Sequence, residues 1–247
     1  MRKNYSIQSM LVLLALLFGV FYFIMPQDYD KTEVPLSEFS TKRALAKVKQ
    51  MTKEPHYVGS KNHEVVAQYM VNELEDLGLQ TSLQEGFTMT EKGTLVYSKN
   101  ILAKIKGSAN TKALLLLSHY DSAPHSFSKG ASDDASGVAT ILESVRAFLH
   151  NKTKHKNDII ILFSDAEELG LNGAALFVTK HKWAKEVGLV LNFEARGSGG
   201  PSYMLMETNQ GNAKMVDAFS DGNVAYPASN SLMYSIYKML PNDTDLT

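Results

Sequence analysis

The spacing of apolar residues after residue 36 predicts helices and strands in alternation. Apolar residues recur every three or four positions in four segments, which we expect to be helices: 37–50, 63–77, 137–149 and 171–180. Two segments alternate between apolar and polar residues and predict strands with one exposed face: 79–89 and 100–105. Short uninterrupted apolar runs predict strands buried on both faces: 113–118, 158–164 and 187–193. This order predicts an α/β fold with a mixed, largely parallel central sheet and helices on both faces.

The N-terminal run Met10–Met25 contains no charged residue. As a helix it would rise about 24 Å, slightly less than the ~30 Å hydrocarbon core of a membrane. Arg2 and Lys3 precede it, so we expect an uncleaved transmembrane anchor whose N-terminus stays in the cytoplasm. A cleaved signal peptide is one alternative, but bulky residues occupy the place of a small-x-small cleavage site. A buried core helix is the other, although this run is apolar on every face.

These patterns divide the chain into four parts. They are a cytoplasmic tail (1–9), the transmembrane anchor (10–25), a proline-containing linker (26–36) and a globular domain (37–247). With the positive flank inside, the globular domain is expected outside the cytoplasm, in a periplasm or a lumen.

The composition excludes several classes of protein. The chain has 25 Lys+Arg and 26 Asp+Glu, and this net charge of −1 gives no basic field for nucleic acid, so no nucleic-acid partner is expected. It has no cysteine, which excludes disulfides, thiolate zinc sites and a cysteine nucleophile. Its 44% hydrophobic and 21% charged residues are typical of a globular chain.

Potential metal ligands follow the end of each buried apolar run. They are, in chain order, His119, Asp121, Asp165, Glu167, Glu168 and Glu194. The loop Gly130–Gly137 adds two adjacent aspartates, Asp133 and Asp134, just before a helix. A helix cap or a solvated acidic turn explains any one cluster, but not all of them together. The carboxyl ends of parallel strands meet at one edge of a sheet, so these groups should converge there. Imidazole with carboxylates suits zinc, or less selectively manganese or cobalt.

In combination, the stretches that contain these residues resemble the co-catalytic zinc peptidases of family M28. The resemblance rests on His119–Ser122, Gly130–Gly137 and Ala166–Gly173. Three more stretches are similar to the membrane-anchored branch of that family, which includes endoplasmic-reticulum metallopeptidases and vacuolar membrane proteases: 55–60, 194–201 and 241–245. The resemblance implies a zinc aminopeptidase-like fold for residues 37–247, two Zn²⁺ ions and peptide substrates.

The resemblance also implies the metal ligands. His119, Asp133 and Glu194 would bind the first zinc ion, and Asp133 and Glu168 the second, with Asp133 bridging the two. The peptide bond between Asp133 and Asp134 is expected to be cis, as in relatives.

The remaining roles concern catalysis. The resemblance makes Glu167 the general base that takes a proton from water, and makes Asp121 the carboxylate that orients the imidazole of His119. Arg196, in a glycine-rich stretch, is a candidate to line the substrate pocket, and a plain glycine turn is the alternative.

One departure from the family pattern concerns histidine. The second zinc ion of the family needs a histidine well beyond the position of Glu194, yet no histidine follows Glu194 here. We therefore expect a C-terminally truncated chain that lacks its fifth ligand and any C-terminal membrane helices, and that is inactive as it stands. The other histidines match no ligand position and are expected at the surface or in loops: His56, His63, His125, His150, His155 and His181.

The sequence thus favours a membrane-anchored zinc metallo-exopeptidase, an aminopeptidase that removes N-terminal residues from peptides. Two alternatives stay open: a catalytically inactive member that serves as a scaffold or receptor, and a glutaminyl-cyclase-like acyltransferase, which shares most of this ligand set.

Overall fold

The computed structural model describes nine ranges of the chain: 6–25, 33–90, 92–109, 112–195, 197, 204–205, 211–222, 231–240 and 243–246. Two compact units are present. One consists of Tyr29–Ser198 with Asp243–Thr247, and the other of Met1–Asp28 with Gly199–Asn242. The first unit contains the sheet and all the candidate ligands.

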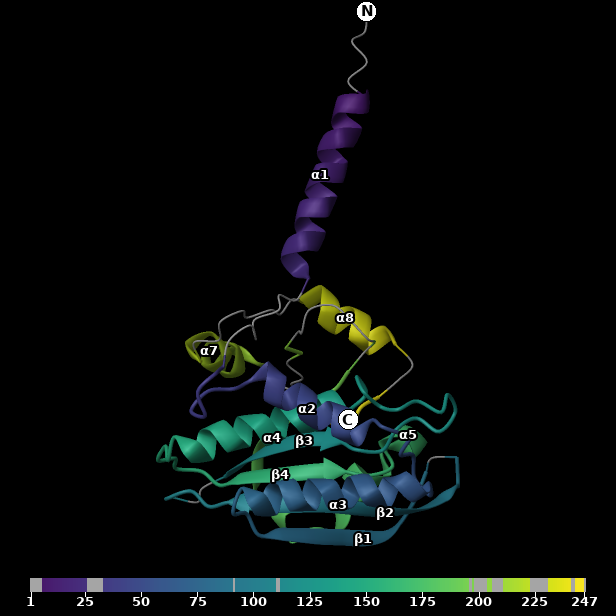
Figure 1. Ribbon diagram of the computed structural model, residues 1–247, viewed down its shortest axis with the longest axis vertical. Coiled ribbons are helices and arrows are strands. Elements are labelled where there is room, and N and C mark those ends of the chain that lie inside the picture. The colour runs from purple at the N-terminus through teal and green to yellow at the C-terminus, as the bar shows by residue number, and fades with distance from the viewer. Residues whose placement is uncertain are drawn as a thin grey trace, which may run out of the picture. The chain divides into compact units, whose positions relative to one another are not determined.

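Five strands form one mixed sheet in the order β1-β2-β4-β3-β5 (Figure 1). Their bounds are Thr81–Met89 (β1), Leu95–Ile105 (β2), Ala113–His119 (β3), Ile159–Ser164 (β4) and Val187–Asn192 (β5). Strand β3 pairs in parallel with β4 and β5, while β2 runs antiparallel to β1 and β4. The predicted mixed sheet is confirmed, with the three apolar runs as its parallel strands. Strand β5 is more exposed than predicted because it lies at the edge of the sheet that the structure describes.

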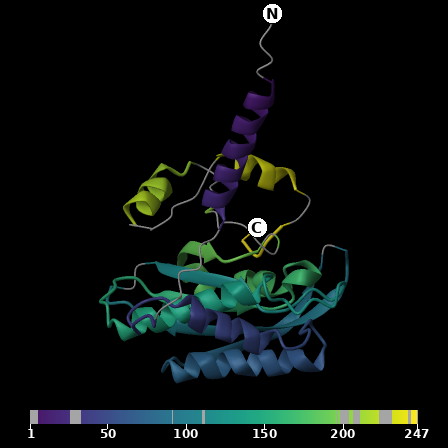
Figure 2. The same ribbon diagram turned by 45° about the horizontal axis from the view of Figure 1, so that its top comes forward.

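Helices cover both faces of the sheet, as predicted. The helices α2 (Thr41–Met51), α3 (Lys61–Asp76) and α4 (Ala135–His150) lie on one face (Figure 1 and Figure 2). On the other face lie α6 (Asn172–Lys180) and the 3₁₀ turn η1 (Lys182–Glu186). Side chains of β4 alternate between the two cores: Ile161 and Phe163 pack under α2–α4, and Leu162 packs with Phe177 of α6.

Several element boundaries differ from the predicted ones for local reasons. Helix α2 begins at Thr41 because the hydroxyl of Ser40 accepts a hydrogen bond from the backbone N–H of Arg43 and caps the helix. Strand β2 begins five residues earlier than predicted because it pairs with β1 along its length. The predicted helix 171–180 is preceded by a separate turn, α5 (Glu167–Gly170), and Leu171 between them has a left-handed backbone.

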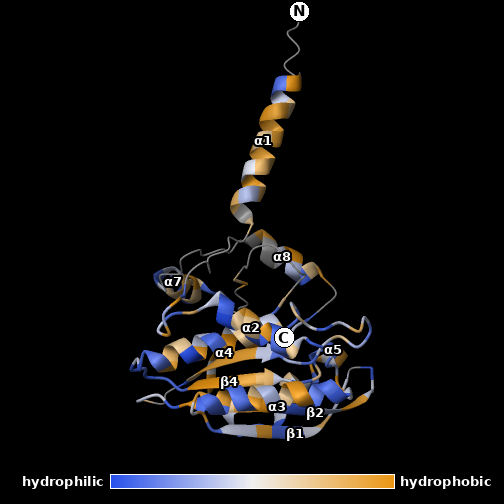
Figure 3. Ribbon diagram, viewed as in Figure 1, coloured by the Kyte–Doolittle hydropathy of each residue, from blue (hydrophilic) through white to orange (hydrophobic). Residues whose placement is uncertain are grey.

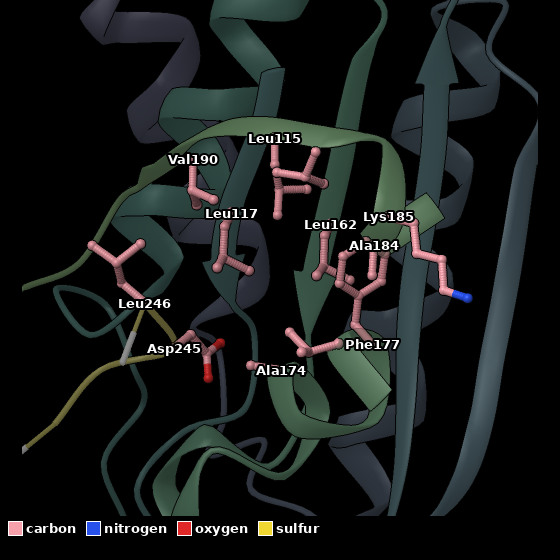
Figure 4. A pocket seen from close by; sticks show the side chains of 12 residues that line it. Leu115, Leu117, Leu162, Ala174, Phe177, Ala184, Lys185, Val190, Asp245 and Leu246 are labelled. Carbon is pink, nitrogen blue, oxygen red and sulfur yellow. The ribbon is translucent and has the colours of Figure 1, made fainter. Parts of the chain in front are cut away.

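The α6 face of the sheet is hollowed by an apolar cavity of about 370 Å³ (Figure 4). Its walls are Leu115 and Leu117 of β3, Leu162 of β4 and Phe177 of α6, and Asp245 adds a carboxylate. Through Asp245 this cavity adjoins the sheet edge at which the candidate ligands lie.

The second unit contains three helices within its described residues: α1 (Ser6–Ile24), α7 (Ala213–Asp221) and α8 (Ser231–Met239). Most of α1 is hydrophobic (Figure 3). Across the described ranges, no helix combines the length and the apolar character needed to span a membrane. The structure therefore does not confirm the predicted transmembrane anchor. Most of the predicted linker, 26–36, lies outside the described residues.

Candidate active site

The candidate ligands converge at one edge of the sheet because β3, β4 and β5 run in the same direction. His119 ends β3 and pairs in register with Ser164, which ends β4. Glu167 and Glu168 follow β4, and Glu194 lies two residues beyond β5. The sequence-based expectation that these groups meet at the carboxyl ends of the strands is thereby confirmed.

His119 lies at the centre of the cluster and is 1% exposed. Its Nε2 lies 2.9 Å from Oδ1 of Asp133 and 3.7 Å from Oε1 of Glu194. Its Nδ1 lies 3.1 Å from the backbone carbonyl of Asp121 and 3.4 Å from that residue's Oδ1. Burial lowers the pKa of His119, but hydrogen bonds with Asp121, Asp133 and Glu194 outweigh it and raise the pKa well above its usual value.

The two adjacent aspartates have different surroundings, and the peptide bond between them is cis, as predicted. Asp134 is buried and caps α4, since its Oδ1 accepts from the N–H of Gly137 and its Oδ2 accepts from the hydroxyl of Ser118. The side chain of Asp133 is 48% exposed. Asp134 nevertheless belongs to a group that could hold a metal ion: ligand atoms of His119, Asp134 and Glu194 all lie within 4.8 Å of one another. The sequence analysis counted Asp134 among the converging acidic residues, with a helix cap as the alternative, and the family resemblance gave it no role as a metal ligand.

Glu167 and Glu168 open the turn α5, and both are tied to Asp121. The Asp121 carboxylate, itself 1% exposed, accepts the backbone N–H of Glu167 at 3.0 Å and that of Glu168 at 3.2 Å. Burial, with nearby carboxylates, raises the pKa of Glu167 to about 8 and that of Glu168 to about 7. Asp121 therefore contacts both His119 and the turn that carries the two glutamates.

These residues fit a divalent cation. One oxygen of Glu194, Oε2, is buried and has no hydrogen-bond partner among the residues that the structure describes. Burial, and after it the repulsion of nearby carboxylates, raises the pKa values of Glu167 and Glu168, and a bound cation relieves that repulsion. A donor set of one imidazole and several carboxylates suits zinc. His119, Asp133 or Asp134, and Glu194 could hold one such ion, with Glu168 nearby.

Comparison with known proteins now assigns the family. The model of peptidase family M28 matches residues 100–247, more than half of the chain. The chain belongs to peptidase family M28. A vacuolar membrane protease from Candida albicans is 38% identical over 181 residues, which are 72% of this chain and 20% of that protein. A putative endoplasmic reticulum metallopeptidase 1-A from Caenorhabditis elegans is 30% identical over 90% of this chain and 27% of its own length.

A solved structure is also similar to this M28 chain. The glutaminyl cyclase of Porphyromonas gingivalis is 26% identical, with a TM-score of 0.54, over 61% of this chain and 56% of that protein. The curated relatives are much longer than the M28 chain, which spans about a fifth to a quarter of the length of the two named above.

Sequence reasoning missed several residues around the M28 site. Asp245 is buried, accepts the hydroxyl of Ser164 through Oδ2, and has a pKa raised by burial to about 6. It is separated from Ser164 by 81 positions, and a spacing pattern does not connect them. The expectation that all six remaining histidines are surface or loop residues was wrong for His63, which lies in α3 and is 5% exposed; His56 lies in a loop as expected, although it is only 1% exposed. Arg196, the candidate pocket residue, lies outside the described residues.

Proposed function

We propose that this chain carries the catalytic domain of a zinc-dependent aminopeptidase. The observation that supports it most directly is a buried imidazole, His119, whose Nε2 faces two carboxylates within 3.7 Å, beside a turn that holds two more. A set of nitrogen and oxygen ligands with a neighbouring protonatable carboxyl is what metal-assisted hydrolysis requires.

The proposed metal site uses the residues that the sequence singled out. His119, Asp133 and Glu194 would hold one zinc ion, and Asp133 and Glu168 would contribute to a second. Asp121 orients His119, because its backbone carbonyl and its carboxylate both face Nδ1 and leave Nε2 turned toward the ligands. Zinc, when bound, supplies a Lewis acid that acidifies water and polarises a carbonyl group.

Glu167 is the proposed general base. Its carboxyl accepts a proton from the attacking water and then donates it to the leaving amine of the cleaved peptide. Burial favours the protonated form of Glu167, and a base that must also act as an acid benefits from a pKa near neutrality. The backbone N–H of Glu167 donates a hydrogen bond to Asp121, and this contact fixes the position of the backbone that carries the proposed base.

Turnover of defined substrates by the full-length protein tests the proposal. Aminoacyl-coumarin amides should be cleaved, their N-acetylated counterparts should not, and a zinc chelator should abolish the cleavage. Cleavage of the acetylated substrates at an equal rate would contradict an aminopeptidase. No cleavage of either class by zinc-loaded protein would favour the inactive scaffold or receptor.

A second candidate function is an acyltransferase of the glutaminyl-cyclase kind. The similarity to the Porphyromonas gingivalis glutaminyl cyclase favours it. The same experiment separates the two functions if a peptide with N-terminal glutamine is included. Loss of ammonia without cleavage of a peptide bond would identify the cyclase.

We further propose that α1 attaches the protein to a membrane, with the catalytic unit on the extracytoplasmic side. The run Met10–Met25 is uncharged, and its described large apolar side chains are 40–85% exposed. Arg2 and Lys3 precede this run, which favours a cytoplasmic N-terminus. The similarity to a vacuolar membrane protease supports the same assignment.

A further inference from the structure

The buried histidine on α3, His63, pairs with a carboxylate beside the proposed active site. Its Nε2 lies 2.8 Å from Oδ1 of Asp165, and the two side chains are 7% and 1% exposed. Its ring also stacks on Tyr120, with the ring centroids 5.0 Å apart and the planes at 21°. Tyr120 stands between His119 and Asp121 in the chain, so His63 contacts both the β3 end and the β4 end of the site.

Asp165 fixes the first residues after β4. Its Oδ1 also accepts the N–H of Ala166 at 2.8 Å, and its Oδ2 accepts the N–H of Lys99 at 2.8 Å. Its own N–H donates to the side chain of Asn100, and its carbonyl accepts from Gly173 at 2.7 Å. A Cβ at Gly173 would lie 2.4 Å from both Asn100 and the Asp165 backbone, so this close approach requires glycine.

The next residue, Ala166, has a left-handed backbone with φ = 58°. This is a conformation that residues other than glycine rarely adopt, and surrounding contacts must maintain it. Glu167 and Glu168 follow immediately, and their N–H groups donate to Asp121. The turn is therefore held by one carboxylate on each side, Asp165 before it and Asp121 across from it.

We propose that His63 is a positioning residue for catalysis: by donating to Asp165 and stacking on Tyr120, it holds the turn that carries Glu167 and Glu168 against the strand end that carries His119. The proposal rests on the proposed function, because it is through these glutamates that His63 affects turnover. A phenylalanine at this position would keep the stack on Tyr120 and lose the donor. A glutamine at this position would place a side-chain N–H donor near the position that Nε2 of His63 occupies.

The experiment compares His63→Phe and His63→Gln in the full-length protein, with His181→Phe as the matched control. The ring of His181 stacks on Phe177, and its Nδ1 accepts the N–H of Trp183, so the control also loses one hydrogen bond but at another place. The readouts are kcat and KM for an aminoacyl substrate, and amide hydrogen exchange of the segment 165–171.

His63→Phe should lower kcat by about 10- to 100-fold, the size expected for misplaced catalytic groups, with KM near that of the wild type. Exchange of segment 165–171 should quicken by about tenfold or more, while β4 and α4 exchange as before. His63→Gln should restore most of the kcat and most of the protection of segment 165–171 from exchange. His181→Phe should change neither quantity.

Wild-type kcat and exchange in His63→Phe would overturn the proposal. So would equal losses in both His63 variants with faster exchange throughout the domain, because His63 would then be only structural. If His63→Phe does not fold, His63→Asn, whose shorter side chain places its amide farther from Asp165, replaces it in the same comparison. A wild-type protein without turnover would refute the proposed function alone, since the exchange of segment 165–171 still decides whether His63 holds the turn.

Discussion

At the scale of single residues, the acid–base behaviour of Glu167 predicts how stability depends on pH when no metal is bound. Its pKa is raised from an ordinary value of 4.5 to about 8, so between these pH values the folded chain keeps a proton that the unfolded chain has released. The free energy of unfolding must then fall as the pH rises through this range. The raised pKa of His119 acts in the same direction, because its stabilisation is lost as the pH rises above 6.5 and through its folded pKa.

We therefore expect chelator-treated protein to unfold at a lower temperature at pH 8 than at pH 5.5. Each kcal/mol corresponds to a shift in Tm of about 2–4 °C for a domain of this size. Glu167→Gln should reduce the difference, since the uncharged amide does not titrate. Thermal unfolding followed by circular dichroism measures this difference in unfolding temperature. An unfolding temperature that rises between pH 5.5 and pH 8 would contradict the raised pKa assigned to Glu167.

At the scale of elements, a buried carboxylate joins α2 to α4. Glu143 of α4 is fully buried and accepts hydrogen bonds from the side chains of Arg43 and Arg146 and from the backbone N–H of Ser40. Burial raises its pKa, but these hydrogen bonds outweigh burial, so the pKa is lowered. Glu143→Ala should lower the free energy of unfolding by about 3 kcal/mol, as expected when one partner of a buried ion pair is removed.

Denaturant unfolding measures this loss. The control is Glu64→Ala, which removes a 64% exposed carboxylate from an ion pair with Lys99 and should cost no more than about 1 kcal/mol. Equal costs for the two variants would contradict the role given to Glu143.

The elements themselves were largely predictable from the sequence, and the contacts between them were not. Apolar runs gave β3 and β4 to within one residue, because strands buried on both faces need uninterrupted apolar side chains. His119 and Glu167 were predictable as neighbours because parallel strands bring their ends to one edge. The burial of His63 depends on a partner 102 positions away, and no local spacing records such a pairing.

At the scale of the whole molecule, membrane attachment is the prediction to test. Deleting residues 1–25 from this 247-residue chain should move it from the membrane pellet to the soluble fraction, because the deletion removes the uncharged run Met10–Met25. Substituting Arg2 and Lys3 with glutamine is the matched control: it should leave the protein in the pellet and weaken only its orientation. Fractionation followed by immunoblotting measures both. Pelleting of the deleted form, with solubility in mild detergent, would place the membrane contact elsewhere in the chain.

The most direct test of the central claim, a zinc peptidase with Glu167 as base, is the comparison of Glu167→Gln with Glu168→Gln. Zinc content and aminoacyl turnover are measured on full-length protein for both. Glu167→Gln should retain zinc and lose about 10²- to 10⁴-fold in turnover, because only the proton acceptor is removed. Glu168→Gln should lose zinc as well as turnover, since a ligand is removed. Full turnover in Glu167→Gln would contradict the account, as would zinc loss in Glu167→Gln with zinc retained in Glu168→Gln.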